Sequence, residues 1–320
     1  MRILSAADVN RALSMNEAIE AVKVGFVALS AGQAQMPVRT ALPIPGGVTL
    51  TMPAYIGGEP ISTVKIVSVC AENAAAGLPV VMGSVLVIDA QTGQVRALIE
   101  GSSLTALRTG AASGLATDLL ARPDASILAV IGAGVQARTQ IAAVCAVRPI
   151  KTIRIYSPHN AAVLAEELHA LYHLKITAIP DAHSALIGAD VVVAATNSST
   201  PVVRLQDVAP GVHINGVGSY RHDMQEIAAE IVSRAKVVID HRASAWQEAG
   251  DLIIARDRGM LREADVVEIG EVAAGSQAGR TSPEQITFFK SVGSAVQDAA
   301  VAARILAIAE TQNLGTVVIL

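Results

Sequence analysis

The sequence predicts an α/β protein in which a doubly wound parallel sheet is joined to a second, mainly antiparallel α+β domain. Three features predict this fold class. A short apolar run ends in closely spaced glycines at residues 126–137, strand and helix patterns alternate after it, and strand patterns separated by turns precede it. With 320 residues, the chain is long enough for two domains and a large core.

The first third of the chain reads as capped helices followed by strands. Ser5 with Asp8, and Ser14 with Glu17, have capping-box spacing, and the second box opens a helix that runs to about Ala31. The segments that follow are separated by glycine-rich turns, which favours antiparallel pairing. Strands are expected at Arg39–Ile44, Val48–Ala54, Ile61–Val69, Val80–Ile88 and Val95–Glu100.

A helix of small residues at 104–121 leads to the second domain, and Arg122-Pro123-Asp124 marks the expected boundary. The near-continuous apolar strands beyond it suit a parallel sheet that is covered on both faces. They are expected at Ile127–Ile131, Thr152–Tyr156, Lys175–Ile179, Val191–Ala195, Val212–Val217, Val237–Asp240 and Val266–Ile269.

The end of the chain is predicted to be helical. Ser282, Pro283 and Gln285 have the spacing of a capped helix start, and residues 295–310 have apolar side chains at helical spacing. We therefore expect a substrate-binding and dimerisation domain at residues 1–122 plus 295–320, and a dinucleotide-binding domain at 123–294.

The glycines at the start of the second domain point to a ligand. Gly132 permits a tight turn after the strand Ile127–Ile131, and Gly134 lets the backbone approach a pyrophosphate closely. Ala137 is small enough for the next helix to pack on the strand, and the N-terminus of that helix offers N–H groups to an anion. This arrangement predicts a Rossmann-type domain, a nicotinamide cofactor and a hydride-transfer enzyme.

The ribose of such a cofactor is read just after the second strand. The segment Tyr156–Asn160 has no Asp or Glu, which would bind the 2′-hydroxyl of NADH and repel the 2′-phosphate of NADPH. Ser157 and His159 are available there as donors. The sequence therefore favours NADPH over NADH.

Cations of the first domain interrupt apolar or structured surroundings. Lys65 lies in the middle of a strand, where a lysine either reaches solvent at an edge or is held inward against an anion. Arg39 begins a strand, and Arg108 lies in a helix of small residues. Each is most often a surface charge, but as a set they would suit an anionic substrate, with arginine binding a carboxylate in bidentate fashion.

Two polar segments lie where strands of the second domain end, which is where ligands collect in open α/β sheets. One is Ala195-Thr196-Asn197, and the other is 216–223, which brings Ser219, His222 and Asp223 close together in sequence. A polar surface turn and a catalytic loop are both compatible with the second pattern.

Composition excludes several other classes of protein. Basic and acidic residues number 24 and 28, no basic tract is present and aromatic residues make up 2%, so no nucleic-acid partner is indicated. No apolar run is long enough for a membrane span. Cys70 and Cys145 lack metal-site or redox spacing, and His169 and His173 lack the glutamate of a zinc-hydrolase motif. We expect a cytoplasmic protein without a metal site.

Several segments together resemble the ornithine cyclodeaminase/μ-crystallin family, nearly from end to end. They are Met52-Pro53-Ala54, Lys65, residues 107–111, the turn 132–137 with its Gln136, and residues 195–197, 215–219 and 289–293. The resemblance implies a homodimer formed through the antiparallel domain. It also implies that Arg39, Lys65 and Arg108 bind a substrate carboxylate, with Met52 and Gly293 at the same site. The expected dinucleotide-binding residues are Thr109, Gly132, Gly134, Val135, Gln136, Ser157, His159, Ala195, Thr196, Asn197, Val217 and Lys290.

One departure from the family pattern narrows the reaction. Cyclodeaminases carry an Asp directly after a glycine at the place that Ser219 takes here, and serine does not accept a proton as a carboxylate does. The resemblance therefore implies a ketimine reductase that converts Δ1-pyrroline-2-carboxylate or Δ1-piperideine-2-carboxylate to L-proline or L-pipecolate. Lys65, Ser219 and Asp223 are the catalytic candidates, and Ser219, His222, Asp223 and water are candidates for protonating the imine. The alternatives are an amino-acid dehydrogenase, a cyclodeaminase or a crystallin-like binding protein that holds NADPH without turnover.

Overall fold

Residues 1–319, apart from the side chain of residue 74, are described by the computed structural model, which divides into two units. The first unit contains Met1–Arg108 and the segment from Ser294 onward, and the second contains Thr109–Gly293. The division falls inside the helix α3 (Gly101–Leu120), before the change of composition at Arg122.

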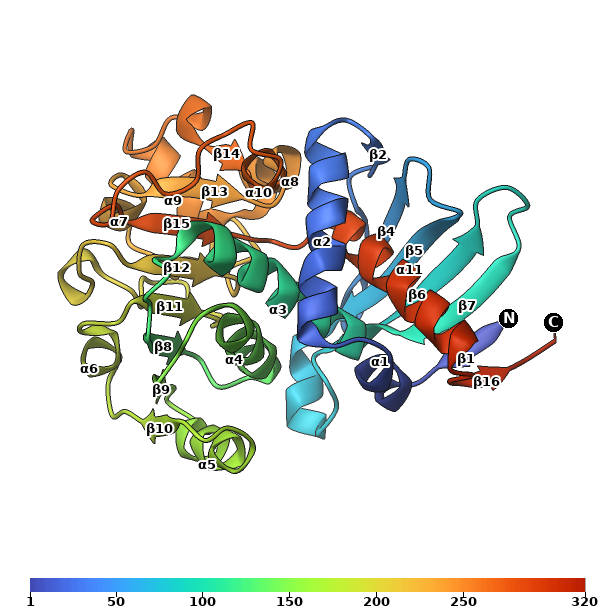
Figure 1. Cartoon of the computed structure of the whole chain (residues 1–320), viewed down its shortest axis with the longest axis horizontal. Helices are drawn as coiled ribbons and strands as arrows, with labels where there is room; N and C mark the ends of the chain where they lie inside the picture. The colour runs from blue at the N-terminus through green and yellow to red at the C-terminus, as the bar shows by residue number, and fades with distance from the viewer. Residues whose placement is uncertain (320) are drawn as a thin grey trace. The chain divides into compact units, whose positions relative to one another are not determined.

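The first unit is built on a mixed, mostly antiparallel sheet (Figure 1). The order is β16-β1-β7-β6-β5-β4-β2, with β3 paired to β4 and only β1–β7 parallel. The strands are β1 (Arg2–Leu4), β2 (Ala34–Gln35), β3 (Thr40–Ile44), β4 (Gly47–Ile56), β5 (Ile61–Val69), β6 (Val81–Asp89), β7 (Val95–Glu100) and β16 (Thr316–Val317). The expected strands at 61–69 and 95–100 are confirmed in full, and the others to within a few residues.

Helices cover one face of this sheet. The helix α11 (Ala295–Thr311) packs across β4, β5 and β6, and α2 (Met15–Ser30) packs beside it. The remaining helical segments are α1 (Ala6–Ala12) and the 3-10 helix η1 (Ala71–Ala76). Both expected capping boxes, at Ser5 and Ser14, are confirmed. Residues of β5 alternate between buried and partly exposed, so one face of that strand meets α11 and the other faces away from it.

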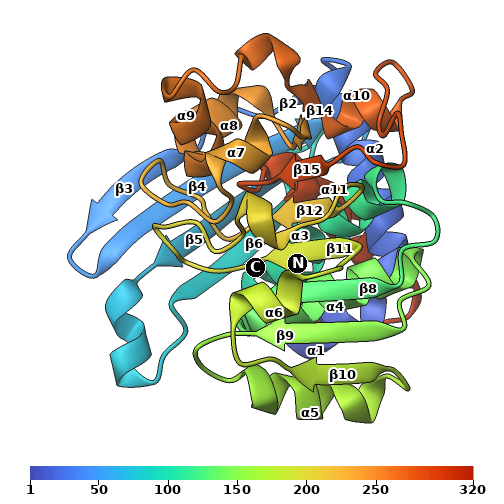
Figure 2. The same cartoon turned by 90° about the vertical axis from the view of Figure 1, so that its left-hand side faces the viewer.

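The second unit contains a fully parallel sheet in the order β10-β9-β8-β11-β12-β15-β13-β14 (Figure 2). The chain runs outward from β8 and then returns to start again at β11, so these two neighbours form the switch point where ligands bind in such folds. The strands are β8 (Ile127–Ile131), β9 (Thr152–Tyr156), β10 (Lys175–Ala178), β11 (Val191–Ala194), β12 (His213–Gly216), β13 (Lys236–Ile239), β14 (Val267–Glu268) and β15 (Thr287–Lys290).

Two apolar cores flank this sheet, which confirms the expectation of strands covered on both faces. The helical segments are α4 (Val135–Val147), α5 (Ala161–Leu171), α6 (Ala182–Leu186), η2 (Leu205–Asp207), α7 (Ala229–Val232), α8 (Arg242–Glu248), α9 (Gly250–Asp257), η3 (Glu263–Asp265) and α10 (Ile269–Ala273). His173 lies beyond the end of α5 and so does not share its helical face with His169.

The helix expected after Ser282 is wrong. Residues 283–284 form a turn, and β15 begins at Thr287, between β12 and β13. The side chain of Gln285 accepts a hydrogen bond from the N–H of Thr281 (2.8 Å), which is one residue earlier than a capping box at Ser282 requires. The buried run Thr287–Lys290 pairs with strands on both sides, and this pairing outweighs the local helix signal.

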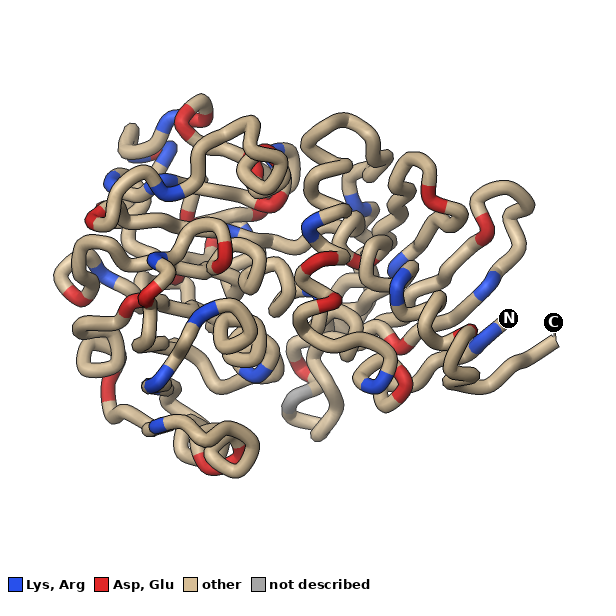
Figure 3. Tube along the Cα trace, viewed as in Figure 1, with Lys and Arg blue, Asp and Glu red and all other residues tan. Residues whose placement is uncertain are grey.

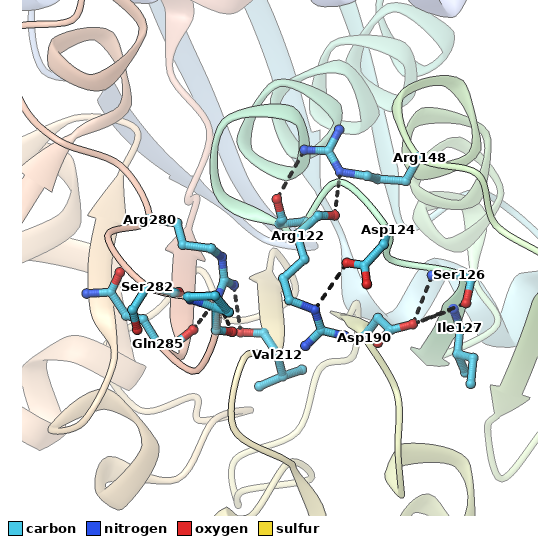
Figure 4. A network of polar contacts seen from close by, with 12 residues as sticks. Arg122, Asp124, Ser126, Ile127, Arg148, Asp190, Val212, Arg280, Ser282 and Gln285 are labelled. Atoms are coloured by element: carbon cyan, nitrogen blue, oxygen red, sulfur yellow. Dashed lines mark hydrogen bonds and ion pairs between the residues drawn. The ribbon is translucent and has the colours of Figure 1, made fainter.

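Arginines surround the C-terminal end of α3 within the second unit (Figure 4). Arg148 donates to the carbonyls of Asp118 (2.6 Å) and Arg122 (3.0 Å), and Arg280 donates to that of Leu120 (2.6 Å). The carbonyls of Asp118 and Leu120 belong to the last turn of α3, which leaves its carbonyls without an internal partner, and cations near them also complement the helix dipole. Burial, and secondarily Arg122 and Arg148, lower the pKa of Arg280 to about 10.

Charged residues are scattered along both units (Figure 3). Among the described residues, no helix combines the length and the apolar character that crossing a membrane would require.

Candidate active site

A buried ion cluster lies inside the first unit, between β5 and α11. The Nζ of Lys65 is 3.3 Å from Oδ1 of Asp298, and the Nε of Arg108 donates to the same oxygen (3.0 Å). Arg108 also donates to Oε1 of Gln297 (2.7 Å). Lys65 is 2% exposed and Asp298 is 0% exposed. The inward alternative for Lys65 is therefore correct, and the anion that the chain itself supplies is Asp298.

The remaining expected residues of this group lie close by. Met52 is buried and stands opposite Lys65 in the β4–β5 register. Arg39 directly precedes β3, and its charge is one of those that act on Lys65. Burial lowers the pKa of Lys65 to about 8, Asp298 opposes this shift, and Arg108 and Arg39 add to it. Two buried cations, Lys65 and Arg108, thus share one carboxylate, which leaves an excess of positive charge inside the unit.

Some polar atoms beside this cluster are buried without a hydrogen-bond partner among the described residues. They are Oγ1 of Thr63, Nε2 of Gln297 and Oδ2 of Asp298. A buried polar atom left unpaired costs about 1–3 kcal/mol, so such atoms are ordinarily satisfied. Donors and acceptors in excess beside an excess of cations suit a small polar anion as ligand.

The glycine turn after β8 has the geometry that a dinucleotide requires. Gly132 has φ +112°, and a Cβ there would lie 2.4 Å from the carbonyl oxygen of Ala195, so only glycine fits. A Cβ on Gly134 would meet nothing within 4 Å. Gly134 is the N-cap of α4 and makes no side-chain cap, so the first N–H groups of the helix, at Val135 and Gln136, have no partner within the helix. These residues fit a bound pyrophosphate.

The segment after β9 lies where the ribose is expected. Ser157 is half-buried, His159 is exposed, and the hydroxyl of Ser157 accepts a hydrogen bond from the N–H of His159 (3.3 Å). Asn160, at the start of α5, has a positive φ of 62°. The segment 157–160 thus presents hydroxyl, imidazole and amide groups and no carboxylate.

A second buried polar cluster joins the ends of β11, β12 and β15. Lys290 donates to the carbonyl and to Oγ of Ser219 (both 2.6 Å) and lies 3.1 Å from Oδ2 of Asp251. Ser219 donates its hydroxyl proton to that same carboxylate. Glu226 accepts hydrogen bonds from Thr196 and from the backbone at Ser219. Burial raises the pKa of Glu226, while Lys290 and the hydrogen bonds from Thr196 act in the opposite direction.

Other expected site residues of the second unit lie in different surroundings. Asp223 is exposed and pairs with Arg221 (Oδ1 to Nε, 3.0 Å), which lowers the pKa of Asp223, so it stands apart from the cluster around Ser219. The N–H of Gly293 donates to Asp240 (2.8 Å), and Gly293 has φ +82°. Thr109 is buried on α3, and its carbonyl accepts from Gln140 (3.2 Å).

Residues that follow β11 and β12 are partly open. Ala195 and Thr196 are half-buried, Asn197 is exposed, and Val217 is half-buried with its N–H bonded to the carbonyl of Ala194 (2.9 Å). They follow β11 and β12, beside the glycine turn that follows β8.

Sequence reasoning missed the buried acids. Asp298 and Gln297 lie in a helix that reads as uniformly Ala-rich, and Glu226 and Asp251 lie in segments of unremarkable composition. A carboxylate within an otherwise apolar pattern was the sequence feature that could have pointed to these acids. Such a residue indicates a buried ion pair, because an acid is rarely buried unless it is paired. Asp298 pairs with Lys65, 233 residues away, and Glu226 bonds Thr196, 30 residues away, so these pairings were not visible in the sequence.

Comparisons with known proteins found a matching family model and similar proteins over most of the chain. Residues 1–313 match the model of the ornithine cyclodeaminase/mu-crystallin family. A Delta(1)-pyrroline-2-carboxylate reductase from Bacillus cereus is 38% identical over 308 residues, which is 94% of each chain.

Solved structures are similar over nearly the whole chain. The Delta(1)-pyrroline-2-carboxylate reductase from Thermococcus litoralis, in complex with NADH and L-proline, is 40% identical, with a TM-score of 0.96 and coverage of 99% of this chain and 100% of that chain. An archaeal alanine dehydrogenase dimer with bound NAD is 34% identical, with a TM-score of 0.93 and coverage of 99% and 98%.

Proposed function

The chain belongs to the ornithine cyclodeaminase/mu-crystallin family, and from this premise we propose that it reduces a small cyclic imine that carries a carboxylate, using a nicotinamide cofactor. Δ1-Pyrroline-2-carboxylate, giving L-proline, is the first-choice substrate, and Δ1-piperideine-2-carboxylate, giving L-pipecolate, is the second. The names of the similar reductases support this choice.

The single observation that carries the proposal is the excess of buried positive charge around Asp298. Arg108 and Lys65 share one carboxylate oxygen, so both retain donors and charge for a second carboxylate. Arg39 and Arg108 would bind the substrate carboxylate, and Lys65 would orient it and add positive potential. Met52 would form an apolar wall beside the ring.

The second unit would bind the cofactor. The N–H groups at the start of α4 would hold the pyrophosphate beside Gly132 and Gly134, and Ser157 and His159 would meet the ribose. The remaining contacts would come from Thr109, Ala195, Thr196, Asn197, Val217 and the 290–293 segment. When bound, the reduced nicotinamide supplies a hydride to the C=N carbon of the substrate.

NADPH is proposed as the preferred cofactor, with NADH also accepted. Support comes from the segment 157–160, which holds no carboxylate to repel a 2′-phosphate. The segment also lacks an arginine that would bind that phosphate, so the preference is expected to be modest.

The imine nitrogen must gain a proton as the carbon gains the hydride. The hydroxyl proton of Ser219 is already donated to Asp251, and Asp223 is exposed beside Arg221 with a lowered pKa. His222 is exposed as well. We therefore assign proton delivery to water rather than to Ser219, His222 or Asp223. Rate enhancement would come mainly from positioning.

The same proposal includes a homodimer and a cytoplasmic location. The face of the first sheet that points away from α11 carries apolar side chains, among them Ile66 (40% exposed) and Met82 (42% exposed). A second copy of the chain would cover this face, and the similar alanine dehydrogenase is described as a dimer. Both cysteines are free, which suits a reducing compartment.

The test measures the oxidation of NADPH or NADH in the presence of each imine. The loss of absorbance of the reduced nicotinamide reports the rate. Rapid oxidation with either imine supports the proposal, and the ratio of the two cofactors measures the preference. Tight cofactor binding without oxidation of either imine would contradict it, and would leave an amino-acid dehydrogenase or a binding protein as the function.

A further inference from the structure

Two carboxylates and one ammonium group are completely buried behind the loops that end β11, β12 and β15. Glu226, Asp251 and Lys290 are each 0% exposed. Burying a charge costs several kcal/mol unless the charge is paired and hydrogen-bonded. The bonds that these side chains make therefore show which parts of the chain the cluster holds in place.

Glu226 joins two loops with one carboxylate. Its Oε1 accepts from the N–H (2.6 Å) and the hydroxyl (2.8 Å) of Thr196, which lies just after β11. Its Oε2 accepts from the N–H groups of Gly218 (2.7 Å) and Ser219 (2.9 Å), just after β12. Four donors meet two oxygens, so only a group that accepts on both oxygens fits here.

Asp251 holds the backbone at Glu226, and Lys290 connects the cluster to the end of β15. Oδ1 of Asp251 accepts from the N–H groups of Glu226 (2.7 Å) and Ile227 (2.9 Å). Its Oδ2 accepts the hydroxyl of Ser219 and pairs with Lys290, the last residue of β15. Each charged group in the cluster therefore has a partner within the chain.

The two loops approach so closely that no side chain fits between them. A Cβ on Gly218 would lie 2.0 Å from the carbonyl oxygen of Thr196 and 2.5 Å from Oε1 of Glu226. The strands themselves are already paired, from Val191–Ala194 with His213–Gly216. The carboxylate of Glu226 therefore acts on the loops beyond the strands, and strand pairing does not depend on it.

We propose that Glu226 is a positioning residue for the dinucleotide, which fixes the Thr196 loop and the 217–219 loop in the arrangement that the cofactor requires. This inference rests on the proposed function, since that function places Thr196 and Val217 against the cofactor. Lys290 acts through the same cluster, because its ammonium protons are used by Ser219 and Asp251.

The test compares Glu226→Gln with Glu230→Gln, a matched change at an exposed residue of α7. In Glu226→Gln, one carboxylate oxygen is replaced by an NH2 group. This donor then faces the N–H donors of one loop, so it cannot accept their hydrogen bonds. We expect it to raise the Kd for NADH, measured by fluorescence titration, and the KM for NADPH by about tenfold or more. The KM for the imine should change by less than about threefold, and Glu230→Gln should match the wild type in every measurement.

Stability must be measured on the same samples. A Glu226→Gln protein that melts at a lower Tm but, while folded, binds NADH as tightly as the wild type would overturn the inference, since the residue would then be a structural brace only. If that variant does not fold, Glu226→Asp keeps the carboxylate but shortens the side chain, so that it no longer reaches both loops, and should raise the Kd for NADH by about threefold or more. An unchanged Kd in that variant would overturn the inference.

The two proposals fail in different ways. A wild-type protein that binds NADH but reduces neither imine contradicts the proposed reaction, and the binding titration of Glu226→Gln still decides the positioning role.

Discussion

The Nζ of Lys65 lies 3.3 Å from Oδ1 of Asp298. The two residues are 233 positions apart in the sequence, and their contact joins the strand β5 to the helix α11. Both side chains are almost completely buried. The pair places a titratable cation inside the first unit, beside a second cation, Arg108, that uses the same oxygen. This arrangement leads to testable expectations about substrate binding.

Replacing Lys65 with Met should abolish imine reduction and leave cofactor binding intact. The variant removes one cation of the carboxylate site, while Arg108 still pairs with Asp298. We expect kcat/KM for the imine to fall by about 100-fold or more, with the Kd for NADPH changed by less than about twofold. Lys151→Met, at an exposed residue, is the control. Loss of NADPH binding in Lys65→Met would contradict this role.

Substrate affinity should weaken as the pH rises through about 8. Burial lowers the pKa of Lys65 to about 8, so above that pH the side chain loses the charge that attracts a carboxylate. L-Proline is a suitable probe, because its carboxylate stays ionised and its basic secondary ammonium group stays protonated around this pH. Its Kd should rise above pH 8 in the wild type and stay flat in Lys65→Arg. A flat profile in the wild type would exclude Lys65 from the site.

The lowered pKa of Lys65 should also make the free energy of unfolding depend on pH. The pKa of Lys65 is lower in the folded protein than its ordinary value of 10.5, so between about 8 and 10.5 the unfolded state binds more protons. The contribution of Lys65 to the free energy of unfolding therefore rises with pH across that window. Denaturant titrations should show this rise in the wild type and lose it in Lys65→Met.

Two neighbouring glycines should respond differently to substitution. Gly132→Ala forces a Cβ to within 2.4 Å of the carbonyl of Ala195 at a positive φ, and should destabilise the fold by about 1–3 kcal/mol. The Cβ of Gly134→Leu meets nothing within 4 Å, so this variant should keep the wild-type Tm, but its side chain would fill the place proposed for the pyrophosphate. Scanning calorimetry measures the change in stability of each variant, and titration with NADPH measures the change in cofactor binding. Normal NADPH binding by Gly134→Leu would place the cofactor elsewhere.

An acid at the ribose segment should reverse the cofactor preference. Ser157→Asp places a carboxylate where a 2′-phosphate is expected, and repulsion should lower kcat/KM with NADPH by about tenfold or more. The value with NADH should fall by less than about threefold, because a carboxylate accepts a hydrogen bond from the 2′-hydroxyl. Equal losses with both cofactors would show that Ser157 does not contact this part of the ribose.

The face of the first sheet that points away from α11 should determine whether the chain forms a dimer. Ile66→Arg places a charge in the middle of the face proposed to meet a second copy, and sedimentation should then show a monomer. Val163→Arg, at a residue of α5 that is 61% exposed, is the matched control and should leave the assembly unchanged. A dimer that persists in Ile66→Arg would assign the interface to another surface.

Local signals in the sequence were sufficient for much of the fold. The strand Ile127–Ile131 and the turn with Gly132 and Gly134 have residue types that suit few other structures, and both capping boxes depend only on residues three apart. For the same reason, the sequence determined the alternation of strand and helix in the second unit and the turn-linked strands of the first.

Tertiary structure decided what depends on distant partners. Residues 287–290 became a strand because β12 and β13 pair with them on both sides, which no local pattern reports. Lys65 turned inward because Asp298 arrives on α11, and Glu226 became buried because donors from two loops meet it. A charge is stable inside a protein only when its partner is present, and that partner is known only once the chain has folded.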